Sequence, residues 1–329
     1  GGTWMPNVVP YSAPDPAADP FPDGTARGVD YRGWPVATGA TLTPLEQRWL
    51  GITARLGGRM SADARQALAR AVRAAGLEHA SVAVDDARIP GWLADAGLAG
   101  IRCRVAPELF NETRMVKTPA EIDHLRTAAR TNEVALLATA AALREGATWH
   151  ELENVYLASM AGQGARGVYL MCGVGELPAG HVRRGEPVMF DALGQFAHYH
   201  GDFGRCAVVG EPSAEHHRRH RAICTGWEVA REILRPGLRY SEVSRRVGDA
   251  VRAAGIPGFR DPIVHGLGLE HTDDPKPPCV QPQDKPDQVL AADMVINVDL
   301  PHIEIGWGSV HTEDTVRITA TGCERLGVA

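Results

Sequence analysis

The chain of 329 residues lacks the features that would place it in a membrane, on nucleic acid or outside the cell. Its apolar runs are far shorter than the roughly 18 residues that cross a bilayer. Lys and Arg form no blocks and the formal net charge is −6, which argues against a nucleic-acid partner. The six cysteines include no C-x-x-C pair. We therefore expect free thiols in a cytoplasmic protein without membrane contact.

The distribution of proline and of hydrophobic patterns divides the chain into three parts. Residues 1–36 are rich in proline, which predicts an extended arm that is either disordered or laid across a partner subunit. Residues 37–113 alternate between helical and strand patterns, which predicts a small α/β domain of structural role. Residues 114–329 are long enough for a second, larger domain.

Helix starts in the larger part are marked by capping boxes at 118–121 (TPAE) and 148–151 (TWHE). The segment LREG at 143–146 returns as LRPG at 234–237, which is 91 residues later, and a helical pattern follows each copy. We interpret this as an internal duplication. A pseudo-twofold axis between the copies would bring acidic residues from both halves together.

The stretch 188–209, VMFDALGQFAHYHGDFGRCAVV, organises the chain. It predicts two apolar strands joined by a turn at Gln195–Ala197, with Asp191 in one strand and Asp202 in the other. The two carboxylates would then face each other, about 5 Å apart. Carboxylates this close repel unless a proton or cation lies between them, and a divalent metal pair fits the gap. The alternative is two surface aspartates beside a turn.

Three later segments supply further metal-binding side chains. His265 lies in VHGLG, Asp299 ends the apolar strand MVINVD, and Glu313 opens the alternating strand EDTVRI. A turn at 306–308 would bring Glu313 beside Asp299. One imidazole with four carboxylates suits Mn, Co, Fe or Zn better than Ca or a soft copper site.

The order and spacing of these residues resemble the creatinase/prolidase/aminopeptidase P superfamily, the pita-bread metallohydrolases. The resemblance covers residues 114–325 and, more loosely, the N-terminal domain. Asp191 and Asp202, eleven residues apart, match the first two ligand positions of the family. His265 matches its histidine ligand and Glu313 its final glutamate ligand.

The resemblance implies an α/β (α+β) pita-bread catalytic domain, a smaller N-terminal α/β domain and a homodimer. It also implies two divalent metal ions and a hydroxide between them that attacks a carbonyl of a small-molecule or short-peptide substrate. Asp191 and Asp299 would ligate one ion and His265 the other. Asp202 and Glu313 would bridge both ions, and Asp299 would carry a proton. A metal-dependent lyase and a metal-free binding or scaffold relative are the alternatives.

Some positions depart from the family pattern. Asp299 replaces a glutamate, which shortens the side chain by one C–C bond of about 1.5 Å. Gly204 replaces a threonine. The second histidine of the family would stand seven residues after the first, where this chain has Thr272. His271 stands one residue early, and it would serve in catalysis only if a bulge turns it inward. A hydrolase of another small amide, cyclic amide or amidine is therefore as well supported as an ordinary Xaa-Pro peptidase.

The remaining candidates concern substrate binding and proton transfer. His181 is either a substrate histidine or a solvated loop residue, and Tyr199 matches a family residue near the second aspartate. His198 and His200 alternate on one predicted strand face. Such alternation is typical of a polar surface, or His200 supplies a missing imidazole to the site. Trp307 either lines the pocket or packs in the core or at a dimer interface.

Overall fold

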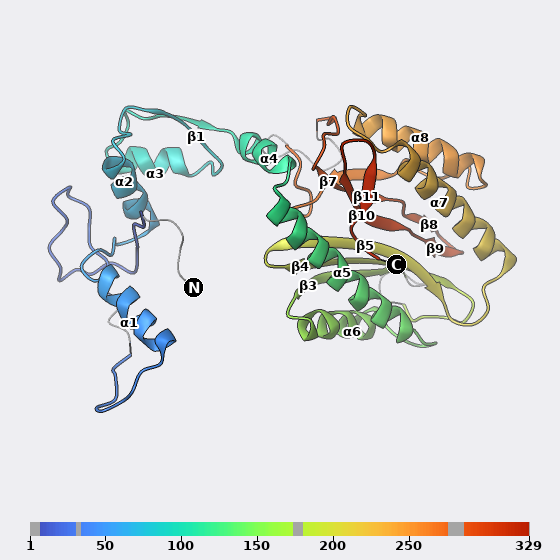
Figure 1. Ribbon diagram of the computed structural model, residues 1–329, viewed down its shortest axis with the longest axis horizontal. Coiled ribbons are helices and arrows are strands. Elements are labelled where there is room, and N and C mark those ends of the chain that lie inside the picture. Colours follow the sequence, from blue (N-terminus) through green and yellow to red (C-terminus); the bar gives the residue numbers. More distant parts are fainter. Residues whose placement is uncertain (1–6, 31–33, 174–179, 276–285, 329) are drawn as a thin grey trace. The chain divides into compact units, whose positions relative to one another are not determined.

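The computed structural model describes residues 7–30, 34–173, 180–275 and 286–328 (Figure 1). The chain divides by its internal contacts into two units, Gly1–Ala106 and Pro107–Ala329. We predicted a boundary after residue 113, which would cut helix α4 (Pro107–Met115), a member of the second unit. Among the described helices, none combines the length and the apolar character that a membrane crossing requires.

The first unit contains a parallel strand pair with helices before and between its strands. Its elements are α1 (Pro44–Leu56), α2 (Ala64–Ala74), β1 (Ser81–Val84), α3 (Ile89–Asp95) and β2 (Arg102–Val105). The α/β pattern predicted here is confirmed, with a small apolar core around Ala69, Leu93 and Leu98. Helix α2 begins after Asp63, whose side chain accepts a hydrogen bond from Gln66 N.

The proline-rich segment is hydrogen-bonded to its own unit over residues 7–30. Ser12 N donates to Ser61 O and Gly28 N donates to Met60 O, each at 2.9 Å. The side chain of Phe21 is buried and lies under the guanidinium group of Arg70. Over the part that the structure describes, this segment therefore packs on residues 58–62 rather than standing free.

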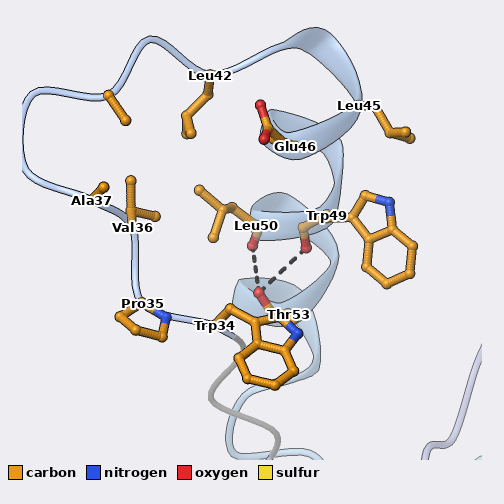
Figure 2. A pocket seen from close by; sticks show the side chains of 11 residues that line it. Trp34, Pro35, Val36, Ala37, Leu42, Leu45, Glu46, Trp49, Leu50 and Thr53 are labelled. Carbon is orange, nitrogen blue, oxygen red and sulfur yellow. Dashed lines mark hydrogen bonds between the residues drawn. The ribbon is translucent and has the colours of Figure 1, made fainter.

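A cavity of about 510 Å³ opens beside α1 in the first unit (Figure 2). Its described lining is mainly apolar and includes Trp34, Trp49 and Leu50. The charged side chain in that lining, Glu46, accepts hydrogen bonds from the Thr43 backbone and hydroxyl group. This cavity therefore holds no described cluster of acids, bases or metal ligands.

The second unit is built on a largely antiparallel sheet in the order β3-β4-β5-β10-β7-β6, with β11 paired to β10. Its helices besides α4 are α5 (Pro119–Ala141), α6 (Trp149–Gly162), α7 (Ala214–Ile233) and α8 (Tyr240–Ala253). Its strands are β3 (Arg166–Gly173), β4 (Pro187–Phe196), β5 (Tyr199–Val208), β6 (Ile263–Gly266), β7 (Val295–Asp299), β8 (His302–Glu304), β9 (Gly308–Val310), β10 (Glu313–Ile318) and β11 (Cys323–Arg325).

The two halves of this unit repeat the same order of elements, which agrees with the predicted duplication. Helices α5 and α6 pack on β3, β4 and β5, whereas α7 and α8 pack on β10, β7 and β6 (Figure 1). The capping boxes predicted at Thr118 and Thr148 are both present. The halves meet where β5 lies beside β10, and the candidate site lies at this seam.

The central hairpin forms, but its turn lies at residues 197–198 rather than at 195–197. Ala197 and His198 make a two-residue turn with φ angles of 49° and 72°, so the predicted turn at Gln195–Ala197 is wrong. Asp191 consequently pairs with Gly204 rather than facing Asp202. The two aspartates still share one face of the sheet, because they are diagonal neighbours across the strand pair. His198 belongs to the turn and not to a strand face.

Candidate metal centre

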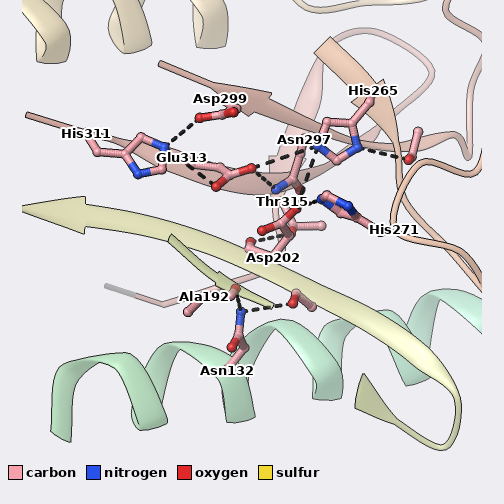
Figure 3. A network of polar contacts seen from close by, with 12 residues as sticks. Asn132, Ala192, Asp202, His265, His271, Asn297, Asp299, His311, Glu313 and Thr315 are labelled. Carbon is pink, nitrogen blue, oxygen red and sulfur yellow. Dashed lines mark hydrogen bonds and ion pairs between the residues drawn. The ribbon is translucent and has the colours of Figure 1, made fainter. Parts of the chain in front are cut away.

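Four strands bring the carboxylates together at the seam between the halves. Asp191 comes from β4 and Asp202 from β5, while Asp299 on β7 pairs directly with Glu313 on β10. Glu313 also pairs with Gly204 of β5, which places both halves of the sheet against one another at this point. The turn region before β10 therefore returns Glu313 to Asp299, as the sequence predicted (Figure 3).

Helix α5 fixes the hairpin from behind. The Asn132 amide donates to Ala192 O at 2.6 Å and to Gly201 O at 2.9 Å, which are the backbone neighbours of the two aspartates (Figure 3). Tyr156 in turn donates to Asn132 Oδ1. The side chains of Asn132 and Tyr156 are buried, and their hydrogen bonds hold the backbone beside each aspartate in a satisfied polar network.

Atoms that could bind a metal ion form three overlapping groups, each with its atoms within 4.8 Å of one another. The first is Asp202, His265 and His271, the second is Asp299, His311 and Glu313, and the third is Asp191, Asp202 and Glu313. Asp202 and Glu313 each belong to two groups. The five predicted ligands therefore lie together, and two further imidazoles join them.

One end of the cluster carries two imidazoles. His265 Nε2 lies 3.6 Å from Asp202 Oδ2 and 3.9 Å from Glu313 Oε1. His271 Nε2 lies 2.9 Å from the same Asp202 oxygen, and its side chain is 41% exposed. The loop after β6 turns His271 inward without a strand bulge, because it leaves the sheet at Gly266.

This loop is held from several sides. Asp273 N donates to Gly266 O at 2.9 Å, and Asp274 accepts from Gly266 N at 2.9 Å. The buried Asp273 carboxylate lies 2.7 Å from Arg114 Nη2 and 3.7 Å from Nζ of the buried Lys117. These contacts fix the backbone of the loop and so restrict where the ring of His271 can lie.

The other end of the cluster contains His311, which the sequence analysis missed. Its side chain is fully buried, with Nε2 at 2.5 Å from Asp299 Oδ1 and 3.7 Å from Glu313 Oε2. Nδ1 lies 3.0 Å from Phe190 O. The spacing His-x-Glu at the start of β10 places His311 two residues before the predicted ligand Glu313, and this period-two relation is the sequence signal that could have found it.

Several buried oxygen atoms of the cluster have no hydrogen-bond partner among the described residues. They are Asp202 Oδ1, Glu313 Oε2 and Asn297 Oδ1. The amide of Asn297 donates instead to Glu313 Oε1, at 2.8 Å. Buried carboxylate and amide oxygens are costly to leave unpaired, so these atoms fit a cation that would complete the cluster. The mixed oxygen and nitrogen donors agree with a divalent ion of the Mn, Co, Fe or Zn class.

The electrostatics of the cluster also fit a bound cation. Burial, with the charge of Glu313, raises the pKa of Asp191 to about 7 and raises the pKa of Asp202 well above its ordinary value. Burial would raise the pKa of Glu313 as well, but the hydrogen bond with His265 and the charge of His311 lower it. Burial opposes the charge on His311, yet the Asp299 carboxylate raises its pKa to about 9. Carboxylates that repel in this way are stabilised by a cation between them.

The other predicted residues lie outside these groups. His200 is buried, with Nε2 at 2.8 Å from Gln195 Nε2 and Nδ1 at 3.2 Å from Gly268 O. Tyr199 donates to Glu121 Oε1 at 3.2 Å. Trp307 packs against the core of α7 and α8, under the guanidinium of Arg219. His181 is exposed and forms a backbone bridge with Thr148.

The comparisons with known proteins agree with this arrangement. A family model described as metallopeptidase family M24 matches residues 123–320. The chain is 28% identical over 231 residues to a Xaa-Pro dipeptidase of Pyrococcus furiosus, a match that covers 67% of this chain and 65% of the relative. It is 26% identical over 147 residues to an ectoine hydrolase of Halomonas elongata, covering 44% of this chain and 36% of that protein. The chain thus spans slightly less than two thirds of the length of the curated dipeptidase.

Two solved structures resemble the fold. The X-Pro aminopeptidase from Thermotoga maritima has a TM-score of 0.71 at 21% identity, and the similarity covers 86% of this chain and 84% of that one. The prolidase from Pyrococcus furiosus has a TM-score of 0.64 at 23% identity, covering 75% of each chain. These similarities confirm the predicted pita-bread fold.

Proposed function

The chain belongs to metallopeptidase family M24, and on this premise we propose that it hydrolyses a C–N bond of a small, peptide-like substrate at a pair of divalent metal ions. The observation that carries the proposal is the overlap of three ligand groups through Asp202 and Glu313. A carboxylate with two oxygens can bind two ions at once, and a metal pair is typically about 3.5–4 Å apart.

The described residues divide naturally between two ions. Asp202 and Glu313 would bind both, His265 would bind the ion on its own side, and Asp191 and Asp299 would bind the other. When bound, such ions lower the pKa of a coordinated water molecule and polarise a substrate carbonyl group.

Asp299 is suited to proton transfer. Burial raises the pKa of Asp299 above its ordinary value when no ion is bound, so this carboxyl group holds a proton more readily than an exposed aspartate does. Its Oδ1 atom is paired with His311, so Oδ2 is the atom that would take a proton and return it to the leaving nitrogen. His271 is more exposed than the other two rings of the cluster and would contact the substrate.

The substrate class follows from the relatives and from the departures in sequence. A Xaa-Pro dipeptidase and an ectoine hydrolase both match this chain, so dipeptides and small cyclic amides or amidines are the candidates. We further infer a cytoplasmic homodimer. The cytoplasmic location is inferred from the cysteines, because those that the structure describes, which do not include Cys279, are free thiols. The dimer rests on the family resemblance and would be measured by light scattering.

Metal content and product analysis together test the proposal. The protein is dialysed against Mn²⁺ or Zn²⁺, the ions bound per chain are counted, and Xaa-Pro dipeptides and ectoine are offered with and without chelator. We expect two ions per chain and chelator-sensitive cleavage that incorporates oxygen from isotopically labelled water. Protein that binds no ion, or a product without the labelled oxygen, would overturn hydrolysis; the second result would indicate elimination.

A further inference from the structure

His311 is a buried imidazole to which the proposed mechanism assigns no metal ion. It lies two residues before Glu313, and its side chain has no measurable exposure. Because Nδ1 lies 3.0 Å from Phe190 O, which can only accept a hydrogen bond, Nδ1 carries the ring proton of a neutral His311. Nε2 faces Asp299 and Glu313 and shares a proton with Asp299 Oδ1 when no ion is bound, and a cation at this place would displace that proton and accept the Nε2 lone pair (Figure 3).

This hydrogen-bond pattern is the one that orients metal-bound histidines. A ligating imidazole almost always donates its other N–H to a carbonyl or carboxylate, which fixes the tautomer and the plane of the ring. The Phe190 carbonyl supplies that partner here. Asp299, His311 and Glu313 can each place a ligand atom within 4.8 Å of the others.

Two departures from the family pattern agree with an added ligand at this place. Gly204 stands where the family has a threonine, and a Cβ atom built at this glycine would overlap the ring of His311. Asp299 stands where the family has a glutamate, and its carboxylate contacts Nε2 of His311. The absence of a side chain at Gly204 makes room for the ring of His311. That ring would supply a metal-ligand atom where the side chain of Asp299 is shorter than that of a glutamate.

We propose that His311 Nε2 is a direct ligand of the metal ion bound by Asp191, Asp299 and Glu313, and that Gly204 and Asp299 are the residues that accommodate it. The inference rests on the proposed function, since it requires that the cluster holds divalent ions. It would give each ion of the pair at least one imidazole ligand.

The first test measures Mn²⁺ binding to the full chain and to His311→Gln by equilibrium dialysis. We expect His311→Gln to bind one of two ions at least about tenfold more weakly, the lower limit of losses seen when even a supporting group of a metal site is removed. His302→Gln, a buried histidine away from the cluster, is the matched control and should bind both ions as the wild type does.

A second readout separates a ligand from a charged neighbour. Pulsed electron paramagnetic resonance of bound Mn²⁺ detects directly coordinated imidazole nitrogen, and we expect one fewer coupled nitrogen in His311→Gln than in the wild type. A protonated His311 would repel a cation, so its removal would strengthen binding. Stronger or unchanged binding with an unchanged nitrogen signal would overturn the inference.

A third test asks whether His311 compensates for the shorter side chain of Asp299, by replacing this aspartate with the glutamate of the family pattern. In the wild type, Asp299→Glu should weaken Mn²⁺ binding because the longer side chain meets the ring of His311. In the His311→Gln background the same change should restore binding. Equal effects of Asp299→Glu in both backgrounds would contradict the coupling. A wild type that binds no ion would overturn the proposed function as well, whereas two tightly bound ions in both wild type and His311→Gln would overturn this inference alone.

Discussion

The two ends of the metal cluster are built in opposite ways. At one end His271 is 41% exposed and is carried by a loop, whereas at the other end His311 is fully buried where β10 begins. The loop end depends on contacts between residues distant in sequence, such as Asp273 with Lys117. The strand end depends on pairing between neighbouring strands, since Glu313 lies opposite both Asp299 and Gly204. Strand pairing in the sheet therefore sets the position of His311, whereas the buried charges of Asp273 and Lys117 set the position of the loop that carries His271.

This difference also separates the chemistry of the two ends. The buried end excludes water and strengthens every electrostatic interaction, which favours tight metal binding and proton transfer. The exposed end leaves an imidazole ring accessible, which favours contact with an incoming substrate. Changes at the shared residues should affect both ends, and changes at supporting residues should affect only one.

The largest effect is expected from Glu313→Gln, because this residue belongs to two of the three ligand groups. The substitution removes a charged oxygen donor and should lower kcat/KM by more than about 100-fold, which exceeds the usual loss for a supporting group. Metal analysis should show that ions are lost from both ends. Glu324→Gln on β11, in a half-buried ion pair with Arg126, is the control and should keep both ions. Retention of two ions by Glu313→Gln would contradict its bridging role.

Lys117→Met should loosen the loop that carries His271 without affecting the end of the cluster that contains His311. Removal of one partner from a buried ion pair costs about 3–5 kcal/mol, and Arg114 would remain beside Asp273 and reduce this cost. We expect a loss near the lower limit in urea unfolding. Substrate KM should rise more than kcat falls, since His271 would lose its support. Arg65→Met, which removes an exposed pair with Asp63, should change stability by less than about 1 kcal/mol.

Lys117→Met combined with Asp273→Asn should recover much of the loss, because no unpaired buried charge then remains. If the double variant is no more stable than the single one, the ion pair is not what holds the loop.

The pH dependence of stability should differ between metal-free and metal-bound protein. The folded-state pKa of Asp191 is raised to about 7 from an ordinary value of 3.8, so the folded state holds an extra proton between these values. Stability therefore falls as pH rises through that range, by at most about 1.4 kcal/mol per pH unit from this group. The pKa of His311 is raised from 6.5 to about 9, so this group also makes stability fall as pH rises between these two values.

Thermal unfolding with chelator should consequently give a midpoint that decreases from about pH 5 to about pH 9, and saturating Mn²⁺ should abolish or reverse this trend. The lowered pKa of Glu313 acts in the opposite direction, but only below its ordinary value of 4.5. A metal-free midpoint that rises across this range would show that the carboxylates do not repel one another in the folded protein.

The smallest effect on catalysis is expected from His200→Gln. Both ring nitrogens of His200 already lie within hydrogen-bonding distance of Gln195 and Gly268, so the ring would not exchange protons with a substrate. We expect a loss of about 1–2 kcal/mol in stability from the broken hydrogen bonds. The kcat value at saturating metal should stay close to that of the wild type. A large fall in kcat with unchanged stability would restore His200 as a catalytic candidate.

The sequence predicted best those features that regular strands impose. Alternation and strand ends marked Asp191, Asp202, Asp299 and Glu313, and these four carboxylates do lie together. The position of the hairpin turn was predicted less well, because Ala197 and His198 adopt positive φ angles, which are uncommon for residues other than glycine and especially so for alanine. Propensity rules place such a turn at glycine or asparagine, and neither stands there.

The sequence by itself determined the order of the secondary-structure elements in the larger unit, the capping boxes at Thr118 and Thr148, and the identity of most candidate donors in the cluster. Those features depend on neighbours within a few residues, and local patterns record them directly. Only the tertiary structure decided that His271 reaches Asp202 and that His311 occupies the space left by Gly204. Such contacts join residues 69 and 107 positions apart, and no local periodicity encodes which distant side chains share one buried volume.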